Sequence, residues 1–222
     1  MTRAGSPPLW GALFDWDGVL VDSKALHEAA WDQVAREFGY PHGPDDFRRY
    51  FGSQNRRAIT EILRWTSNLA LVERISVRKE IIYRERLGTA DIWMPGSLAF
   101  VESLAARGVP CAVVSSSPRA NIDVVLGQGS LRAQFRALIT SEDTRVGKPD
   151  PEGFLLGAAR LELPPERCVV FEDAPAGIQA GLAGGMRVVA LSTTHPASEL
   201  GQAELVAPAL SAELVPAIER WF

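Results

Sequence analysis

Five short apolar runs separated by helical segments are the feature that most restricts how this chain can fold. We expect these runs to be strands, at residues 9–14, 109–114, 137–139, 168–171 and 186–191. Each is bounded by turn residues or charged residues, as is typical of strands buried on both faces of a parallel sheet. The intervening helical segments are expected at residues 97–107, 120–126, 152–161 and 176–183. This alternation predicts an α/β fold with an open, doubly wound parallel sheet.

A long interruption follows the first predicted strand. Between residues 24 and 92, apolar side chains recur at helical spacing, as at Leu26, Ala30 and Val34, and no convincing strand is present. We therefore expect an all-helical insert, with Pro95 and Gly96 marking the return to the sheet. The predicted domains are an α/β core formed by residues 1–22 and 93–222 and a helical cap formed by residues 23–92.

The charge and composition of the chain restrict the classes of molecule that the protein can bind. The 222 residues carry a formal net charge of −4, which leaves no basic footprint for nucleic acid or for an anionic membrane. No apolar stretch approaches the roughly 20 residues that span a bilayer, and the N-terminal residues make a poor secretory signal. Cys111 and Cys168 lie in apolar runs and are expected to be buried and reduced. We expect a cytoplasmic protein, monomeric or weakly dimeric, that acts on a small molecule.

Chemically active side chains follow four of the predicted strands in order. They are Asp15 and Asp17 before Gly18, then Ser115, Ser116 and Ser117, then Lys148 shortly past the third strand, then Glu172 and Asp173. The DxDG segment alone is as consistent with a polar turn as with chemistry. Because ligands bind at the carboxyl ends of parallel strands, the ordered set indicates one shared site at that edge.

The set fits phosphoryl transfer to a carboxylate. A phosphate monoester repels a carboxylate nucleophile such as Asp15, so the site must neutralise both groups. Mg²⁺ does this with hard oxygen ligands, for which Asp15 and Asp173 are the best candidates. Lys148 adds a fixed positive charge, and the hydroxyls of Ser115 and Ser116 can bind phosphate oxygens. Asp17 can protonate the leaving alkoxide and later deprotonate water, a role that requires a raised pKa.

These residues resemble the motifs of the haloacid dehalogenase-like superfamily of aspartyl phosphatases and phosphomutases. The resemblance covers essentially the whole chain, through DWDGVLVDS, VVSSS, GKPDP and FEDAPAGIQAG, and the insert resembles the small helical cap of the subfamily containing phosphoglycolate phosphatase, sugar-phosphate phosphatases and β-phosphoglucomutase. The resemblance implies that Asp15 is the nucleophile and Asp17 the acid/base. It also implies that Asp173 and the Asp17 backbone carbonyl join Asp15 in binding Mg²⁺, that Lys148 and Ser115 hold the phosphate, and that Glu172 supports the acidic cluster.

Substrate choice is expected in the cap, since the core recognises little beyond phosphate and metal. The candidate contacts are Arg56 and Lys79, with Ser23 and His27 near the hinge. For Arg56 and Lys79 the alternative is a solvated helix face.

The leading hypothesis is a Mg²⁺-dependent phosphatase of a sugar phosphate or a phosphoglycolate-like metabolite. The alternative is a β-phosphoglucomutase-like mutase, but Pro118 and Arg119 replace that enzyme's lysine and asparagine, and Asn55 replaces its phosphate-binding arginine. A more remote alternative is a phospho-acceptor signalling domain, a class that carries its aspartate on a later strand and lacks so large an insert.

Overall fold

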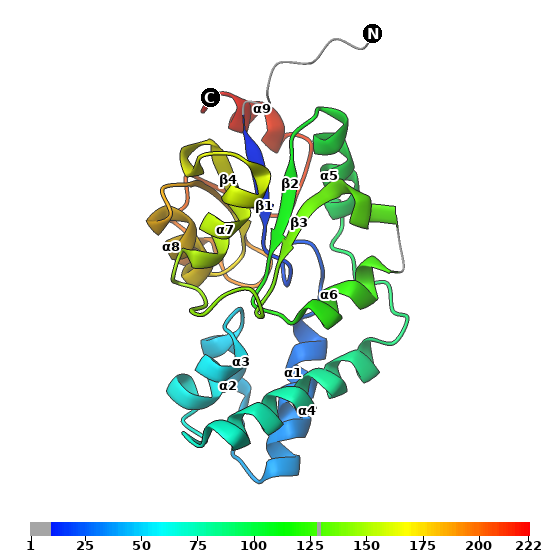
Figure 1. The fold of residues 1–222 in the computed structure, drawn as a ribbon, viewed down its shortest axis with the longest axis vertical. Coiled ribbons are helices and arrows are strands. Elements are labelled where there is room, and N and C mark those ends of the chain that lie inside the picture. The colour runs from blue at the N-terminus through cyan, green and yellow to red at the C-terminus, as the bar shows by residue number, and fades with distance from the viewer. Residues whose placement is uncertain (1–9, 128–129) are drawn as a thin grey trace.

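A six-stranded parallel sheet forms the centre of the protein (Figure 1). The structure is a computed structural model that describes residues 10–127 and 130–222. Its strands are β1 (Gly11–Phe14), β2 (Cys111–Val114), β3 (Phe135–Ile139), β4 (Cys168–Glu172), β5 (Arg187–Leu191) and β6 (Leu205–Ala207). All five predicted strands are confirmed, although Leu9 of the first lies outside the described residues. Strand β6 was not predicted, because it is three residues long and half-buried at the sheet edge.

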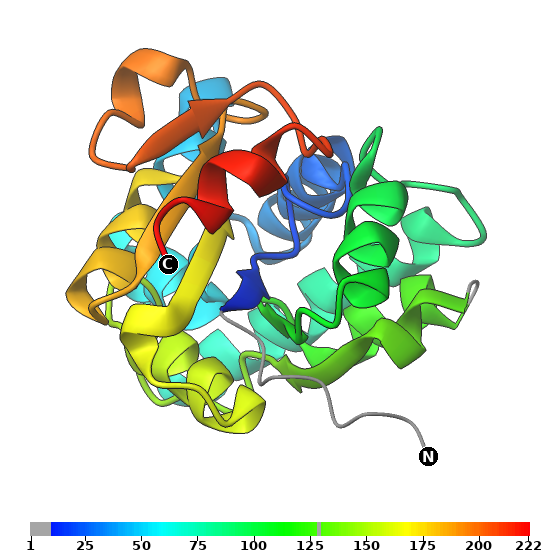
Figure 2. The ribbon, with the colours of Figure 1, turned by 90° about the horizontal axis from the view of Figure 1, so that it is seen from above.

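Helices cover both faces of the sheet (Figure 2). On one side lie α5 (Ser97–Ala106) and α9 (Leu214–Glu219), and on the other α7 (Glu152–Leu161) and α8 (Pro175–Ala183). Helix α6 (Arg119–Leu126) follows β2, and short helical turns occur at Ser130–Gln134, Pro165–Arg167 and Ala197–Glu199. The doubly wound architecture is therefore confirmed.

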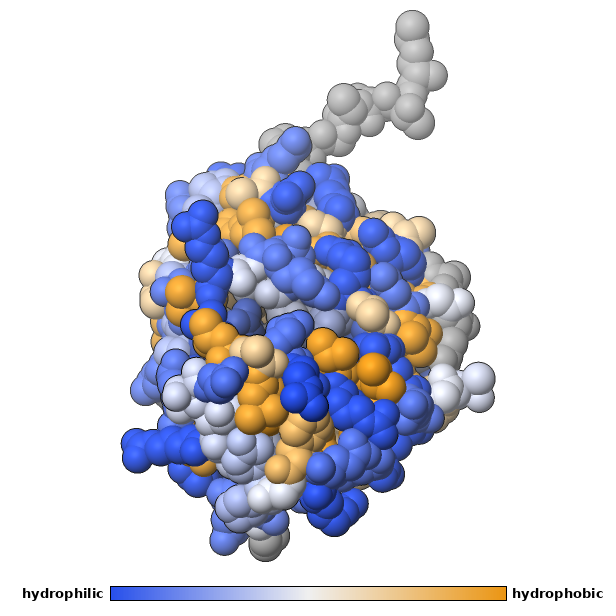
Figure 3. Space-filling view, turned by 60° about the horizontal axis from the view of Figure 1, so that its bottom comes forward, coloured by the Kyte–Doolittle hydropathy of each residue, from blue (hydrophilic) through white to orange (hydrophobic). Residues whose placement is uncertain are grey.

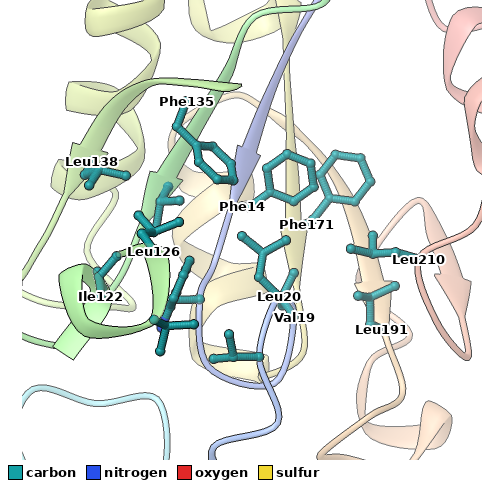
Figure 4. Packing of buried hydrophobic residues seen from close by; sticks show 14 of the residues in the cluster. Phe14, Val19, Leu20, Ile122, Leu126, Phe135, Leu138, Phe171, Leu191 and Leu210 are labelled. Carbon is teal, nitrogen blue, oxygen red and sulfur yellow. The ribbon is translucent and has the colours of Figure 1, made fainter. Parts of the chain in front are cut away.

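Strand β1 shows why both faces are apolar. Its successive residues Leu13 and Phe14 belong to different core clusters, one with α7 and α8 and one with α5, since neighbouring side chains of a strand point to opposite faces. Phe14 stacks on Phe171 of β4 with ring centroids 4.7 Å apart (Figure 4). Phe100 meets both rings edge-on. Because β1 is so deeply buried, the residue that follows it, Asp15, is held in a rigid position away from solvent.

The strand order brings the site to the carboxyl ends of two neighbouring strands. The order is β3-β2-β1-β4-β5-β6, so the chain runs outward from β1 to β3 and then crosses back to β4 on the other side of β1. Ligands of such sheets bind outside the carboxyl ends of the strands where the order reverses. Here that position lies between β1, which ends before Asp15, and β4, which ends at Glu172.

The insert packs at this carboxyl edge (Figure 1). It consists of α1 (Lys24–Phe38), α2 (Pro44–Tyr50), α3 (Asn55–Arg57), a π-helical turn (Ala58–Ile62) and α4 (Leu69–Leu87), and residues 24–87, all described, contain no strand. Its entry and exit segments run side by side, joined by hydrogen bonds from Asp22 N to Ile92 O and from Met94 N to Leu20 O, both under 3 Å. The predicted domain boundaries lie in these two segments.

The composition leads us to expect no membrane-spanning helix and two buried thiols. Among the described residues, no helix is both long enough and apolar enough to cross a membrane. On the face that brings the insert forward, hydrophilic residues surround the hydrophobic ones (Figure 3). Cys111 and Cys168 are buried free thiols, as expected.

Candidate active site

The carboxylate of Asp15, directly after β1, is buried and paired with a buried lysine. Lys148 Nζ donates to Asp15 Oδ1 at 2.6 Å and to Glu172 Oε1 at 2.5 Å. The second oxygen of Glu172 accepts the backbone N–H groups of Asp173 and Ala174. Glu172 therefore fixes the position of Lys148, and Lys148 fixes that of Asp15. Asp15, Lys148 and Glu172, which the sequence analysis placed at three strand ends, come together here.

Asp173 completes a cluster of three buried carboxylates. Oxygen atoms of Asp15, Glu172 and Asp173 lie within 4.8 Å of one another. Thr194, which follows β5, donates to Asp173 Oδ2. Gly18 packs against the same carboxylate, because a Cβ on Gly18 would lie 2.2 Å from Asp173 Oδ2. Position 18 must therefore be glycine for Asp173 to keep its position.

We expect Gly18→Ala to disturb the site, and Gly185→Ala serves as its control. Both glycines have positive φ, 83° and 75°, so each substitution should cost about 1–2 kcal/mol of unfolding free energy from the backbone alone. A Cβ on Gly185 meets nothing within 4 Å. Denaturant unfolding should therefore show a loss in both variants, whereas activity should fall only in Gly18→Ala. Equal activity of the two variants would contradict the role given to the Gly18–Asp173 contact.

Charge in this cluster is unbalanced in a way that suits a cation. Burial raises the pKa of Asp15 to about 7, with Glu172 and Asp17 adding to the rise, even though Lys148 opposes it. The pKa of Asp173 is also raised well above its usual value, by burial and by the neighbouring Glu172 and Asp15. One ammonium thus faces three carboxylates. The donor set is hard and entirely oxygen, which is the set that a divalent cation such as Mg²⁺ takes.

Asp17 is held by three donors. Oδ1 accepts from Ser23 Oγ at 2.5 Å and lies 3.1 Å from His27 Nε2, and Oδ2 accepts from Ser117 Oγ at 2.7 Å. Burial raises the pKa of Asp17, but His27 and the hydrogen bonds outweigh burial and hold it below its ordinary value. All three donors stabilise the carboxylate, so the pKa of Asp17 is held low in this arrangement, whereas service as a general acid requires a raised pKa.

The serines after β2 divide between two positions. Ser115 is buried, and its hydroxyl oxygen accepts the backbone N–H of Ser117 at 3.0 Å. Ser116 is half-buried and lines the cavity beside Asp17. Ser117, the third of the hydroxyls expected after this strand, donates directly to Asp17.

The insert delivers three of its four predicted residues to the site. Ser23 precedes α1, and its hydroxyl bonds Asp17 instead of capping the helix. His27 reaches Asp17 from the first turn of α1, and Lys79 of α4 approaches His27 Nδ1 at 2.8 Å. Arg56 is exposed and lines a cavity between the insert and the core. The inward position next to it is taken by Asn55, which donates to Glu80.

Thr194, Glu80 and Asn121 were not predicted, for two different reasons. Thr194 follows β5 as the other site residues follow their strands, so the end of that strand carried a readable signal. Glu80 and Asn121 are buried, hydrogen-bonded to one another, and lie on helices of the insert and of the core. No spacing rule connects residues 80 and 121.

Comparison with known proteins agrees with this geometry. Residues 11–185 match the family model described as haloacid dehalogenase-like hydrolase. The chain belongs to this family. The predicted family resemblance and the predicted α/β fold are therefore confirmed.

Relatives in this family include enzymes of phosphorylated metabolites. The chain is 39% identical over 88% of its length to the chloroplastic 5-amino-6-(5-phospho-D-ribitylamino)uracil phosphatase of Arabidopsis thaliana, although it spans only 53% of that protein. It is 33% identical to hexitol phosphatase A of Escherichia coli, over 88% of this chain and 89% of that one. The crystal structure of β-phosphoglucomutase from Clostridium difficile has the same fold, with a TM-score of 0.85, 22% identity, and coverage of 95% and 96% of the two chains.

Proposed function

We propose that this haloacid dehalogenase-like hydrolase is a Mg²⁺-dependent phosphatase of a small phosphorylated metabolite that acts through a phosphoaspartate on Asp15. The observation that carries the proposal is the Asp15 carboxylate, buried where the strand order reverses and paired with Lys148. Hydrolysis of phosphoric monoesters is also the activity named for the Arabidopsis and E. coli relatives. The remote alternative of a phospho-acceptor signalling domain is not supported, since the family is one of hydrolases.

In the first step, Asp15 attacks the phosphorus atom of the monoester. A new bond forms between a carboxylate oxygen and phosphorus, and the bond from phosphorus to the leaving oxygen breaks. Lys148 offsets the negative charge brought together in this step, because its ammonium already lies 2.6 Å from Asp15. Ser115 and Ser116, at the end of the neighbouring strand, offer hydroxyls for the phosphate oxygens.

In the second step, water attacks phosphorus and Asp15 leaves as the free carboxylate. Asp17 is suited to take a proton from this water, since its hydrogen bonds keep it ionised. The same bonds oppose its service as proton donor to the leaving alkoxide in the first step. We infer that Asp17 becomes protonated, and so able to protonate the leaving alkoxide, only when one of its donors, Ser23, His27 or Ser117, is displaced.

Asp15, Asp173 and the backbone carbonyl of Asp17 are the proposed ligands of Mg²⁺. The first two belong to the buried cluster of carboxylates, and Glu172 supports that cluster through Lys148 and two backbone N–H groups. When bound, Mg²⁺ neutralises phosphate and carboxylate charge and polarises the phosphoryl group.

We expect Mg²⁺ to stabilise the folded protein, and Asp173→Asn to lose most of this effect. A ligand that binds only the folded state adds on the order of 2–3 kcal/mol at about a hundredfold excess over its Kd. Thermal unfolding of the substrate-free protein with and without Mg²⁺ measures this. An equal rise in Tm in the wild type and in Asp173→Asn would contradict the assignment of Asp173 as a ligand.

Residues 23–92 are proposed to act as a cap that selects the substrate. Lys79 is already engaged with His27 and Glu80, whereas Arg56 is exposed beside the cavity between insert and core. Arg56 is therefore the proposed cap residue for an anionic or hydroxyl-rich substrate. A sugar phosphate, a polyol phosphate or a phosphoglycolate-like acid carries such groups.

A screen of phosphorylated metabolites with Mg²⁺, scored by release of inorganic phosphate, tests the function. We expect release from one sugar or polyol monophosphate. Incubation with β-glucose 1-phosphate and a trace of its bisphosphate separates the alternative: conversion to glucose 6-phosphate would identify a mutase, and release of phosphate a phosphatase. Absence of release across the screen would contradict the proposal.

A further inference from the structure

A chain of buried side chains leads from Asp17 through the insert and back to the core. His27 Nε2 lies 3.1 Å from Asp17, and His27 Nδ1 lies 2.8 Å from Lys79 Nζ. Lys79 Nζ donates to Glu80 Oε1 at 2.9 Å, and Asn121 of α6 donates to Glu80 Oε2 at 2.6 Å. All five side chains are buried.

The chemistry of these groups fixes the direction of each hydrogen bond. A lysine ammonium can only donate, so His27 Nδ1 must be the acceptor and carries no proton. The proton of the neutral ring is then on Nε2, from which it is donated to Asp17 Oδ1. Lys79 therefore determines which ring nitrogen of His27 carries the proton that is donated to Asp17.

Glu80 is in turn fixed by donors from three elements. Asn55 of α3 donates to Oε1 at 2.7 Å, beside Lys79. On the core side, the guanidinium of Arg84 donates to Asn121 Oδ1 at 2.8 Å, which turns the Asn121 amide nitrogen toward Glu80. Burial raises the pKa of Glu80, but the ammonium of Lys79 and these hydrogen bonds outweigh burial and keep it below its usual value.

We propose that Glu80 is a positioning residue for Asp17. By accepting from Lys79 it holds the ammonium against His27 Nδ1, and this fixes the His27 tautomer that donates to Asp17. Because Asn121 belongs to the core and Glu80 to the insert, the chain is complete only when the insert lies against the core. The proposal deepens the function above and rests on the role given there to Asp17.

The test compares Glu80→Gln with the control Glu85→Gln. Glutamine keeps the shape of Glu80 but removes its charge, and Glu85 is an exposed carboxylate on the same helix. Long-range proton–nitrogen NMR spectra of the histidine side chains report which ring nitrogen carries the proton. The chain has three histidines, of which His42 and His195 lie away from Glu80 and report that the fold is kept.

In the wild type and in Glu85→Gln, we expect His27 in a single form with the proton on Nε2. In Glu80→Gln, we expect this form to be lost while His42 and His195 are unchanged, and kcat to fall roughly 10- to 100-fold with little change in KM. Asn121→Leu should show a smaller effect of the same kind.

An unchanged His27 spectrum in Glu80→Gln would overturn the proposal, whatever happened to kcat. The spectrum is recorded on the resting protein. A wild type with the expected tautomer but no phosphatase activity would therefore count against the proposed function and leave the tautomer assignment standing.

Discussion

Asp15→Asn is expected to abolish turnover while the protein stays folded. An amide nitrogen or oxygen is a poor nucleophile, so the bond to phosphorus does not form, and the loss should be at least about 10³-fold in kcat. The fold should persist because asparagine has nearly the same volume, and it still offers Lys148 an oxygen in place of Asp15 Oδ1. Steady-state phosphate release on the substrate found in the screen measures the loss.

Two controls sharpen this prediction. Circular dichroism and thermal unfolding should show that Asp15→Asn is folded. Asp17→Asn changes the neighbouring carboxylate, which contacts Ser23 and Ser117 and not Lys148. That variant should still accept a phosphoryl group on Asp15, slowly, whereas Asp15→Asn should not. Turnover by Asp15→Asn within tenfold of the wild type would contradict the covalent mechanism.

Lys148→Met is expected to impair both catalysis and stability. Its ammonium contacts Asp15 and Glu172, and all three groups are buried. Removing one partner of a buried ionic group costs about 3–5 kcal/mol, because the remaining charge is left without compensation. Removing a preorganised electrostatic contact typically lowers kcat by about 10²–10³-fold. Denaturant unfolding and phosphate release measure the two effects.

The stability loss in Lys148→Met should grow with pH. Burial already raises the pKa of Asp15 to about 7, and Lys148 opposes that rise. Without the ammonium, folded Asp15 binds its proton more tightly than unfolded Asp15, so folding stability falls as the pH increases. Lys24→Met, at an exposed lysine in the first turn of α1, is the control and should change neither property. A loss in Lys148→Met independent of pH would contradict this reading of the cluster.

The strands and the strand-end residues were predictable because both depend on local sequence. A strand buried on both faces must be a short apolar run, and in a parallel sheet the residues that follow such runs meet at one edge. Asp15, Lys148, Glu172 and Asp173 meet at that edge, as this rule predicts. Thr194 follows the fifth strand and obeys the same rule, although it was not among the predicted residues.

Contacts between the insert and the core were harder to predict from the sequence. Whether Asn55 or Arg56 points inward depends on the rotation of a three-residue helix that continues into a π-helical turn, and adjacent helical positions differ by about 100°. The pairing of Glu80 with Asn121 depends on how α4 packs against α6. Tertiary packing of this kind leaves no periodic signal in the sequence.

The covalent role of Asp15 can be measured directly by trapping the intermediate. The enzyme is mixed with its substrate and Mg²⁺, quenched in acid during turnover, reduced with borohydride and mapped by peptide mass spectrometry. Borohydride reduces an acyl phosphate to an alcohol, so we expect homoserine at position 15, dependent on substrate and absent from Asp15→Asn. Active enzyme without this product at position 15, or with it at position 17, would contradict the account.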